Sequence, residues 1–155
     1  MAEKVASQVQ FAIGQIDQLL ETYTDLLDRA QKSPPDLVEV TALASVLHSF
    51  YNGLENIFLS IAKGVDAQVP TGAHWHRDLL TQMAEPTSGR GPVLTPEMVS
   101  QLADYLGFRH FYRHSYSFYL EWDELEKLVT SLAEVWERAR EEIRVFLEGW
   151  SSNDV

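Results

Sequence analysis

The sequence predicts an all-α fold, an antiparallel up-and-down bundle of four to five helices. Three observations support this prediction. Long stretches carry apolar residues at alternating spacings of three and four, prolines and glycines separate these stretches, and no segment alternates with the period of a strand. Such helices bury their apolar stripes against one another, as in helical bundles.

The first two predicted helices are the longest of the N-terminal half. A stripe from Val5 to Ala30 that includes Tyr23 predicts one helix, and it stops at Ser33-Pro34-Pro35 because proline cannot continue a helix. The second helix is expected from about residue 36 to residue 63, with Gly64 as its C-terminal stop.

Three further segments complete the bundle. A short helix is expected over residues 74–84, and the proline- and glycine-rich residues 85–94 are expected to form a loop. Thr95-Pro96-Glu97 is a helix start, and Gly107 is a candidate for an interruption or bend of that helix. The last helix is expected from near Asp123 to Gly149. We therefore expect one domain over residues 1–150, with a flexible tail at 151–155.

Composition narrows the function classes. The chain has 155 residues, 45% of them hydrophobic, which is enough for a single core. It has no cysteine, so disulfides, thiolate zinc sites and a cysteine nucleophile are excluded. The first residues lack the apolar core of a secretory signal, and no stretch approaches the length of a membrane span, so we expect a cytoplasmic protein without a membrane partner.

The net charge of −11 argues against general nucleic-acid binding, because phosphates require local positive potential. The charge is uneven, however. Residues 71–116 hold four acidic and four basic residues and four of the five histidines, whereas both flanks are acidic. Either the middle segment forms a local anion site, or the uneven charge arises by chance and from solvated helix faces.

The segment Gly107–Tyr116 has the densest functional chemistry. It places two arginines, two histidines and two tyrosines within eight positions. Arginine suits phosphate, histidine can transfer protons near neutral pH, and aromatic rings can stack on bases. The alternative is a polar, aromatic helix face that satisfies its own hydrogen bonds.

This segment resembles the HepT toxins. Arg109, four residues, His114, one residue and Tyr116 reproduce their Arg-x4-His-x-Tyr signature, which belongs to the wider HEPN superfamily of all-helical ribonucleases. Residues 50–55 (FYNGLE) also look like the second-helix segment of HepT-like domains. Residues 75–80 (WHRDLL) and 108–114 (FRHFYRH) look like a subgroup called HepT-like ribonuclease toxins. The resemblance covers nearly the whole chain.

The resemblance implies metal-independent RNA cleavage without a cofactor, with His114 as the acid/base and Arg109 stabilising the phosphate. In a regular helix, positions 109 and 114 lie about 140° apart. Either the arginine stem wraps round the helix, or the helix bends near Gly107, or a second subunit completes the site. The family usually forms homodimers with both motifs in one cleft, which favours the second subunit.

The resemblance also implies control at Tyr116. In HepT systems this tyrosine is the target of a minimal nucleotidyltransferase antitoxin that adds AMP to it; the alternative is a bundle tyrosine. Four further residues are candidates for substrate binding: Arg113, His110, Tyr112 and Glu55. Glu55 could pair with Arg109 or Arg113, in a structural or a catalytic role.

Metal-binding interpretations are weaker. His110 and His114 have zincin-like spacing, but no glutamate base lies between them. His48, His74 and His76 are scattered along the chain, as are the metal-binding histidines of DinB-like bundles. The sequence has no Glu-x-x-His pair, which disfavours a di-iron site. We expect His48 to be a satisfied core or boundary histidine. The competing function class is a non-catalytic HEPN module that binds a nucleotide or a protein partner.

Overall fold

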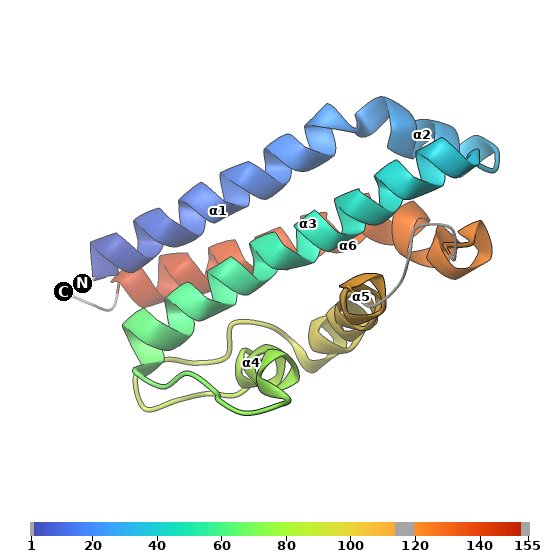
Figure 1. The fold of residues 1–155 in the computed structure, drawn as a ribbon. Coiled ribbons are helices and arrows are strands. Elements are labelled where there is room, and N and C mark those ends of the chain that lie inside the picture. The colour runs from blue at the N-terminus through green and yellow to red at the C-terminus, as the bar shows by residue number, and fades with distance from the viewer. Residues whose placement is uncertain (1, 114–119, 153–155) are drawn as a thin grey trace.

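A computed structural model describes residues 2–113 and 120–152 of the chain. Three long helices are aligned: α1 (Ala2–Thr22), α3 (Leu37–Ile61) and α6 (Trp122–Ser152), with α2 (Thr24–Lys32) continuing the direction of α1. Both α3 and α6 run antiparallel to α1 (Figure 1). α4 (Trp75–Gln82) and α5 (Pro96–Arg113) lie on the other side of α3, and α5 is seen nearly end-on, so it crosses the long helices.

The all-α prediction is confirmed, with six α-helices rather than four to five in the described part of the chain. One apolar core joins them. The fully buried side chains are concentrated on α3, which packs against α1, α4, α5 and α6 and is therefore the central helix. Among the described residues, no helix combines the length and apolarity needed to cross a bilayer.

The N-termini of α3 and α5 are capped by side chains, and of these two caps the one at Thr95 was predicted. Asp36 caps α3 by accepting a hydrogen bond from the Glu39 amide, and the Glu39 carboxylate accepts one from the Asp36 amide in return. Thr95 caps α5 by accepting from the Met98 amide. α6 begins at Trp122, so Asp123 lies in its first turn instead of capping it.

The prediction of a single first helix is wrong, because the helix is interrupted at Tyr23, between α1 and α2. The hydroxyls of Thr22 and Thr24 bond back to the carbonyls of Gln18 and Leu20, a local competition that bends helices. Tyr23 is 36% exposed, so it does not belong to the buried stripe.

The helix ends predicted at Gly64 and Gly149 and the interruption considered at Gly107 also need correction. α3 continues past Gly64 as the π-helical turn η1 (Ala62–Asp66), and the left-handed residue that ends it is Ala67. A Cβ on Gly64 would lie 2.3 Å from Val5 Cγ2, so this glycine allows α1 to approach closely. α5 is not interrupted at Gly107, and α6 continues beyond Gly149 to Ser152.

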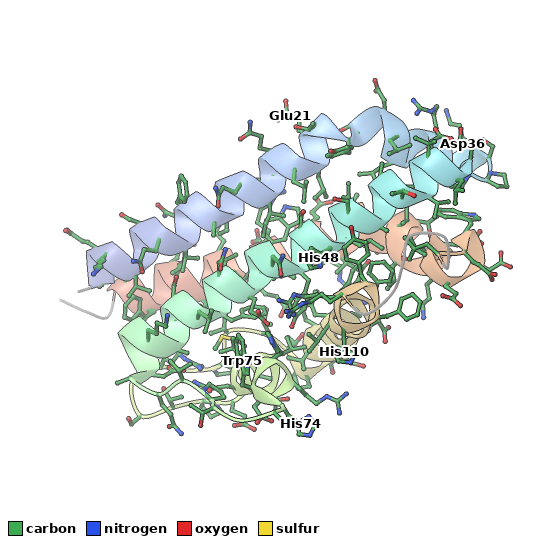
Figure 2. The ribbon with its side chains drawn as sticks, in the orientation of Figure 1. Glu21, Asp36, His48, His74, Trp75 and His110 are labelled. Carbon is green, nitrogen blue, oxygen red and sulfur yellow. The ribbon has the colours of Figure 1, made fainter. Side chains whose placement is uncertain are left out.

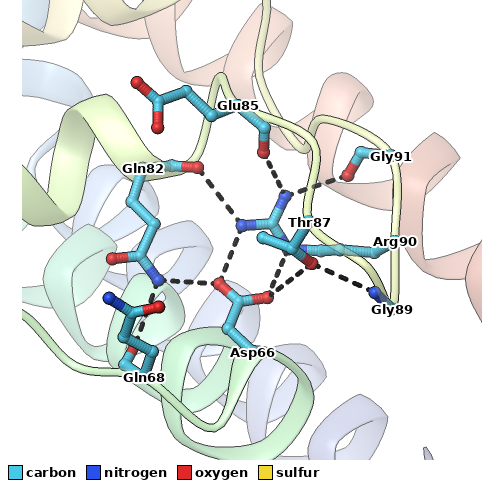
Figure 3. A network of polar contacts seen from close by, with 8 residues as sticks. All are labelled: Asp66, Gln68, Gln82, Glu85, Thr87, Gly89, Arg90 and Gly91. Atoms are coloured by element: carbon cyan, nitrogen blue, oxygen red, sulfur yellow. Dashed lines mark hydrogen bonds and ion pairs between the residues drawn. The ribbon is translucent and has the colours of Figure 1, made fainter.

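The predicted loop at 85–94 is fastened by a buried ion pair. Arg90 makes two bonds to Asp66, from Nε to Oδ1 (2.7 Å) and from Nη2 to Oδ2 (2.8 Å), and both side chains are at most 2% exposed. Its remaining donors reach the carbonyls of Glu85, Gly91 and Gln82 (Figure 3). This arrangement ties the loop to η1 and was not predicted from the sequence.

Candidate functional site

A second polar network connects α3, α4 and α5. Arg109 of α5 donates from Nε to Asn52 Oδ1 on α3 at 2.6 Å. Its Nη2 lies 3.7 Å from Oε1 of Glu55, one turn further along α3. The other oxygen of this carboxylate, Oε2, lies 2.6 Å from Nδ1 of His76 on α4. Glu55 therefore connects an arginine and a histidine from two different helices.

The positions of these side chains follow from helix periodicity. Asn52 and Glu55 are three residues apart, so they share one face of α3. Gly53 between them lets α1 pack closely on the opposite side, because a Cβ there would lie 2.6 Å from Ile16 Cγ1. α4 is fixed on the core by the buried side chains of Leu79, Leu80 and Met83, each of which is at most 2% exposed. This packing places His76 beside Glu55.

The network is buried on the α3 side and reaches solvent at His76. The side chains of Glu55 and Arg109 are 8% and 11% exposed, and that of His76 is 24% exposed. The ring of Trp75 lies over the His76 ring with their centroids 3.6 Å apart, so His76 is held between an aromatic ring and a carboxylate. His74, at the start of α4, is exposed and projects away from α3 (Figure 2).

Two polar atoms near the network have no hydrogen-bond partner among the described residues. They are Nδ1 of His48 and the hydroxyl of Tyr51, both on α3. His48 points toward α5 (Figure 2), where its ring lies 4.9 Å from that of Tyr112. The prediction that His48 is satisfied is therefore wrong for this atom.

Burial and charge hold both of these groups neutral. Burial lowers the pKa of His48, and the positive charges of Arg109 and Arg113 lower it further. Burial raises the pKa of the Tyr51 hydroxyl, and the carboxylate of Glu55 adds to this effect. The α3 face below Arg109 therefore contains uncharged polar groups beside a paired arginine and glutamate.

The structure places the predicted site residues on two sides of α5. Arg109 and Tyr112 face α3, whereas His110 and Arg113 are exposed. The predicted pairing of Glu55 with Arg109 is found, but Asn52 and His76 were not predicted as partners. Asn52 lies inside the segment 50–55 that resembles HepT-like toxins, which was the available signal. His114 and Tyr116 lie outside the described residues.

In the part of the chain that is described, no three histidine or carboxylate side chains gather as metal ligands would. His48, His74 and His76 do not form one cluster: the first packs on Tyr112, the second is exposed, and the third pairs with Glu55.

Residues 42–150 match the protein family described as HepT-like protein. The chain belongs to this HepT-like family of the HEPN superfamily. The matched region covers α4, α5 and almost all of α3 and α6, and so includes every residue of the Asn52–Glu55–His76–Arg109 network. Neither the search of curated proteins nor the search of solved structures found a match.

Proposed function

We propose that this HepT-like chain is a metal-independent endoribonuclease toxin. The observation that supports it most directly is the fixed position of Arg109, the arginine of the Arg-x4-His-x-Tyr motif. Asn52 and Glu55 hold its guanidinium from one side of α3. A preorganised cation stabilises the charge that gathers on a phosphate during cleavage better than a mobile one does.

The proposed reaction is attack of the RNA 2′-hydroxyl on the adjacent phosphorus. A base removes the hydroxyl proton, an acid protonates the departing 5′-oxygen, and Arg109 stabilises the charged phosphate. His114 acts as one of the two proton carriers. Arg113 and His110, which are exposed in the last turn of α5, bind the RNA strand, and Tyr112, which packs on His48, is a further candidate for substrate binding.

We further propose that the active species is a homodimer in which two copies of residues 109–116 line one cleft. Sedimentation at micromolar concentration should give about 35 kDa, twice the chain mass of 17.6 kDa. A monomer of the chain mass under these conditions would contradict a shared cleft.

Neutralisation is proposed to occur by transfer of AMP to Tyr116 from a cognate minimal nucleotidyltransferase antitoxin. The added phosphate would pair with arginines of the cleft and repel RNA by its negative charge. Co-expression followed by peptide mapping should show AMP on Tyr116 together with loss of cleavage. A Tyr116→Phe chain that the catalytically active antitoxin silences equally well would leave complex formation as the mechanism.

One observation favours the alternative of a non-catalytic HEPN module. Arg109 already has two protein partners and is largely buried, as a structural arginine would be. The acidic net charge points the same way. Such a module would bind a nucleotide or a protein partner without cutting RNA.

The deciding experiment is an RNA cleavage assay in excess EDTA with analysis of the product ends. The parent chain should leave 2′,3′-cyclic phosphate or 3′-phosphate ends, and Arg109→Ala and His114→Ala should each remove nearly all activity. Loss of a general acid or base costs about 10²–10⁴-fold in rate. Activity that EDTA abolishes, or variants as fast as the parent, would contradict the proposal.

A further inference from the structure

The carboxylate of Glu55 holds a histidine in the geometry of a general base. A carboxylate only accepts hydrogen bonds, so the 2.6 Å contact between Nδ1 of His76 and Oε2 of Glu55 is a donation from Nδ1–H. In the neutral imidazole with its proton on Nδ1, the lone pair is on Nε2. The structure records no partner for Nε2 among residues 2–113 and 120–152.

The His76 ring is fixed and accessible at the same time. Trp75 covers one face of the ring, and Glu55 binds one edge. The side chain is nevertheless 24% exposed, whereas that of Glu55 is 8% exposed. A buried carboxylate behind a partly exposed imidazole is the arrangement that orients a histidine for proton transfer.

His76 also lies next to the proposed phosphate-stabilising group. The two oxygens of the Glu55 carboxylate contact His76 on α4 and Arg109 on α5. The shared carboxylate therefore brings the guanidinium that would hold a phosphate and the imidazole of His76 to the same part of the site.

We propose that His76 is the general base of the RNA cleavage and that Glu55 is its positioning residue; this inference rests on the ribonuclease function proposed above. Nε2 of His76 takes the proton of the 2′-hydroxyl as the bond from O2′ to phosphorus forms. The bond from phosphorus to O5′ breaks, and the 5′-oxygen takes a proton from a separate general acid. The products are a 2′,3′-cyclic phosphate and a 5′-hydroxyl, and no oxidant or metal is needed.

A purely structural role, in which His76 only fastens α4 to α3, is the competing explanation. α4 is already held by the buried side chains of Leu79, Leu80 and Met83. The loop that follows α4 is fastened by Arg90, whose contacts are buried. Neither attachment requires the His76 side chain to be partly exposed, whereas a general base must be accessible to its substrate.

The test is the pH dependence of kcat for cleavage of an RNA oligonucleotide in EDTA by purified full-length chains. His76→Asn keeps an amide N–H near the position of Nδ1, so the hydrogen bond to Glu55 can survive while the titratable Nε2 is lost. His74→Asn is the matched control, since His74 is exposed at the start of the same helix. We expect kcat of His76→Asn to fall by about 10²–10⁴-fold and the decline of rate at acidic pH to disappear. His74→Asn should match the parent.

Glu55→Gln separates positioning from direct participation. Its rate should fall less than that of His76→Asn. The acid limb of its pH profile should remain, because Nε2 of His76 is still present in this variant. A structural role would change the melting temperature of both variants but would leave the acid limb in place.

The outcomes distinguish the two proposals. If the parent chain does not cleave RNA, the ribonuclease function fails and the role of His76 fails with it. If the parent cleaves RNA and His76→Asn retains the parental kcat and acid limb, the ribonuclease function stands and the general base lies elsewhere.

Discussion

Two polar networks of this molecule have an arginine at the centre, and they differ in how completely that arginine is paired. Arg90 uses all five of its N–H donors, on Asp66 and three backbone carbonyls, and its side chain is fully buried (Figure 3). Arg109 has two contacts among the described residues, to Asn52 and Glu55. On the same helix face as those partners lie polar atoms of His48 and Tyr51 that no described residue pairs with.

The difference indicates a division of roles. Every N–H donor of Arg90 is already used and its side chain is buried, so it has no donor for a ligand. The Asp66–Arg90 pair therefore has a structural role, which is to fasten the loop after α4. Among the described residues, Arg109 has partners for only part of its donors, and the proposed function assigns the others to a phosphate. Arg109 is the arginine of the Arg-x4-His-x-Tyr motif, so the motif belongs to the less completely paired network.

The largest expected effect on stability is at the saturated network. Arg90→Ala leaves the Asp66 carboxylate buried without its charge partner, which typically costs about 3–5 kcal/mol. Urea denaturation measures this loss in the free energy of unfolding. Arg144→Ala is the control, because its pair with Glu141 is exposed and is worth less than about 1 kcal/mol. If Arg90→Ala were as stable as Arg144→Ala, the structural role assigned to the Arg90 network would be contradicted.

A smaller, pH-dependent effect is expected at His48. Its pKa is lowered in the folded protein by burial and by Arg109 and Arg113, so the unfolded chain takes up a proton first as the pH falls. The contribution of His48 is therefore fully present above its ordinary pKa of about 6.5 and is lost as the pH falls below that value. His48→Phe keeps a ring against Tyr112 and removes the titrating group. Its melting temperature should decline less than that of the parent between about pH 7.5 and pH 5.5. Identical declines would show that His48 is not held neutral.

The smallest expected effect compares two buried tyrosines. The Tyr105 hydroxyl donates to the carbonyl of Leu128 at 2.8 Å, whereas the Tyr51 hydroxyl has no partner among the residues described. Tyr105→Phe should destabilise the fold by about 1 kcal/mol, and Tyr51→Phe should be neutral or stabilising. Urea denaturation of both variants tests this. A loss at Tyr51 as large as that at Tyr105 would mean that its hydroxyl has a partner after all.

Helix periodicity predicted most of the fold because apolar spacing is a local signal. The stripes of α3 and α6 are buried as expected, from Val40 to Ile61 and from Leu125 to Phe146. The break at Tyr23 was missed because it depends on hydroxyl-to-carbonyl bonds that a hydrophobic stripe does not reveal. The role of Gly64 was misassigned because its cause is the close approach of Val5, which is distant in sequence.

The candidate site was predictable only where a motif marks it. The motif identified Arg109, and Glu55 was considered as a partner of either Arg109 or Arg113. His76 lies in the segment 75–80 that resembles HepT-like toxins. Its pairing with Glu55, however, joins residues 21 positions apart and depends on how α4 packs. The Asp66–Arg90 pair spans 24 residues and carries no motif, so nothing in the sequence indicated it.

The measurement that tests the central claim most directly is the single-turnover rate of RNA cleavage in EDTA for Arg109→Gln and Arg144→Gln. Each variant removes one positive charge, but only Arg109 belongs to the network proposed to stabilise the phosphate. We expect Arg109→Gln to be slower than the parent by about 10²–10³-fold, as for loss of one transition-state donor, and Arg144→Gln to match the parent. Arg109→Gln that folds and cleaves at the parental rate would contradict the account.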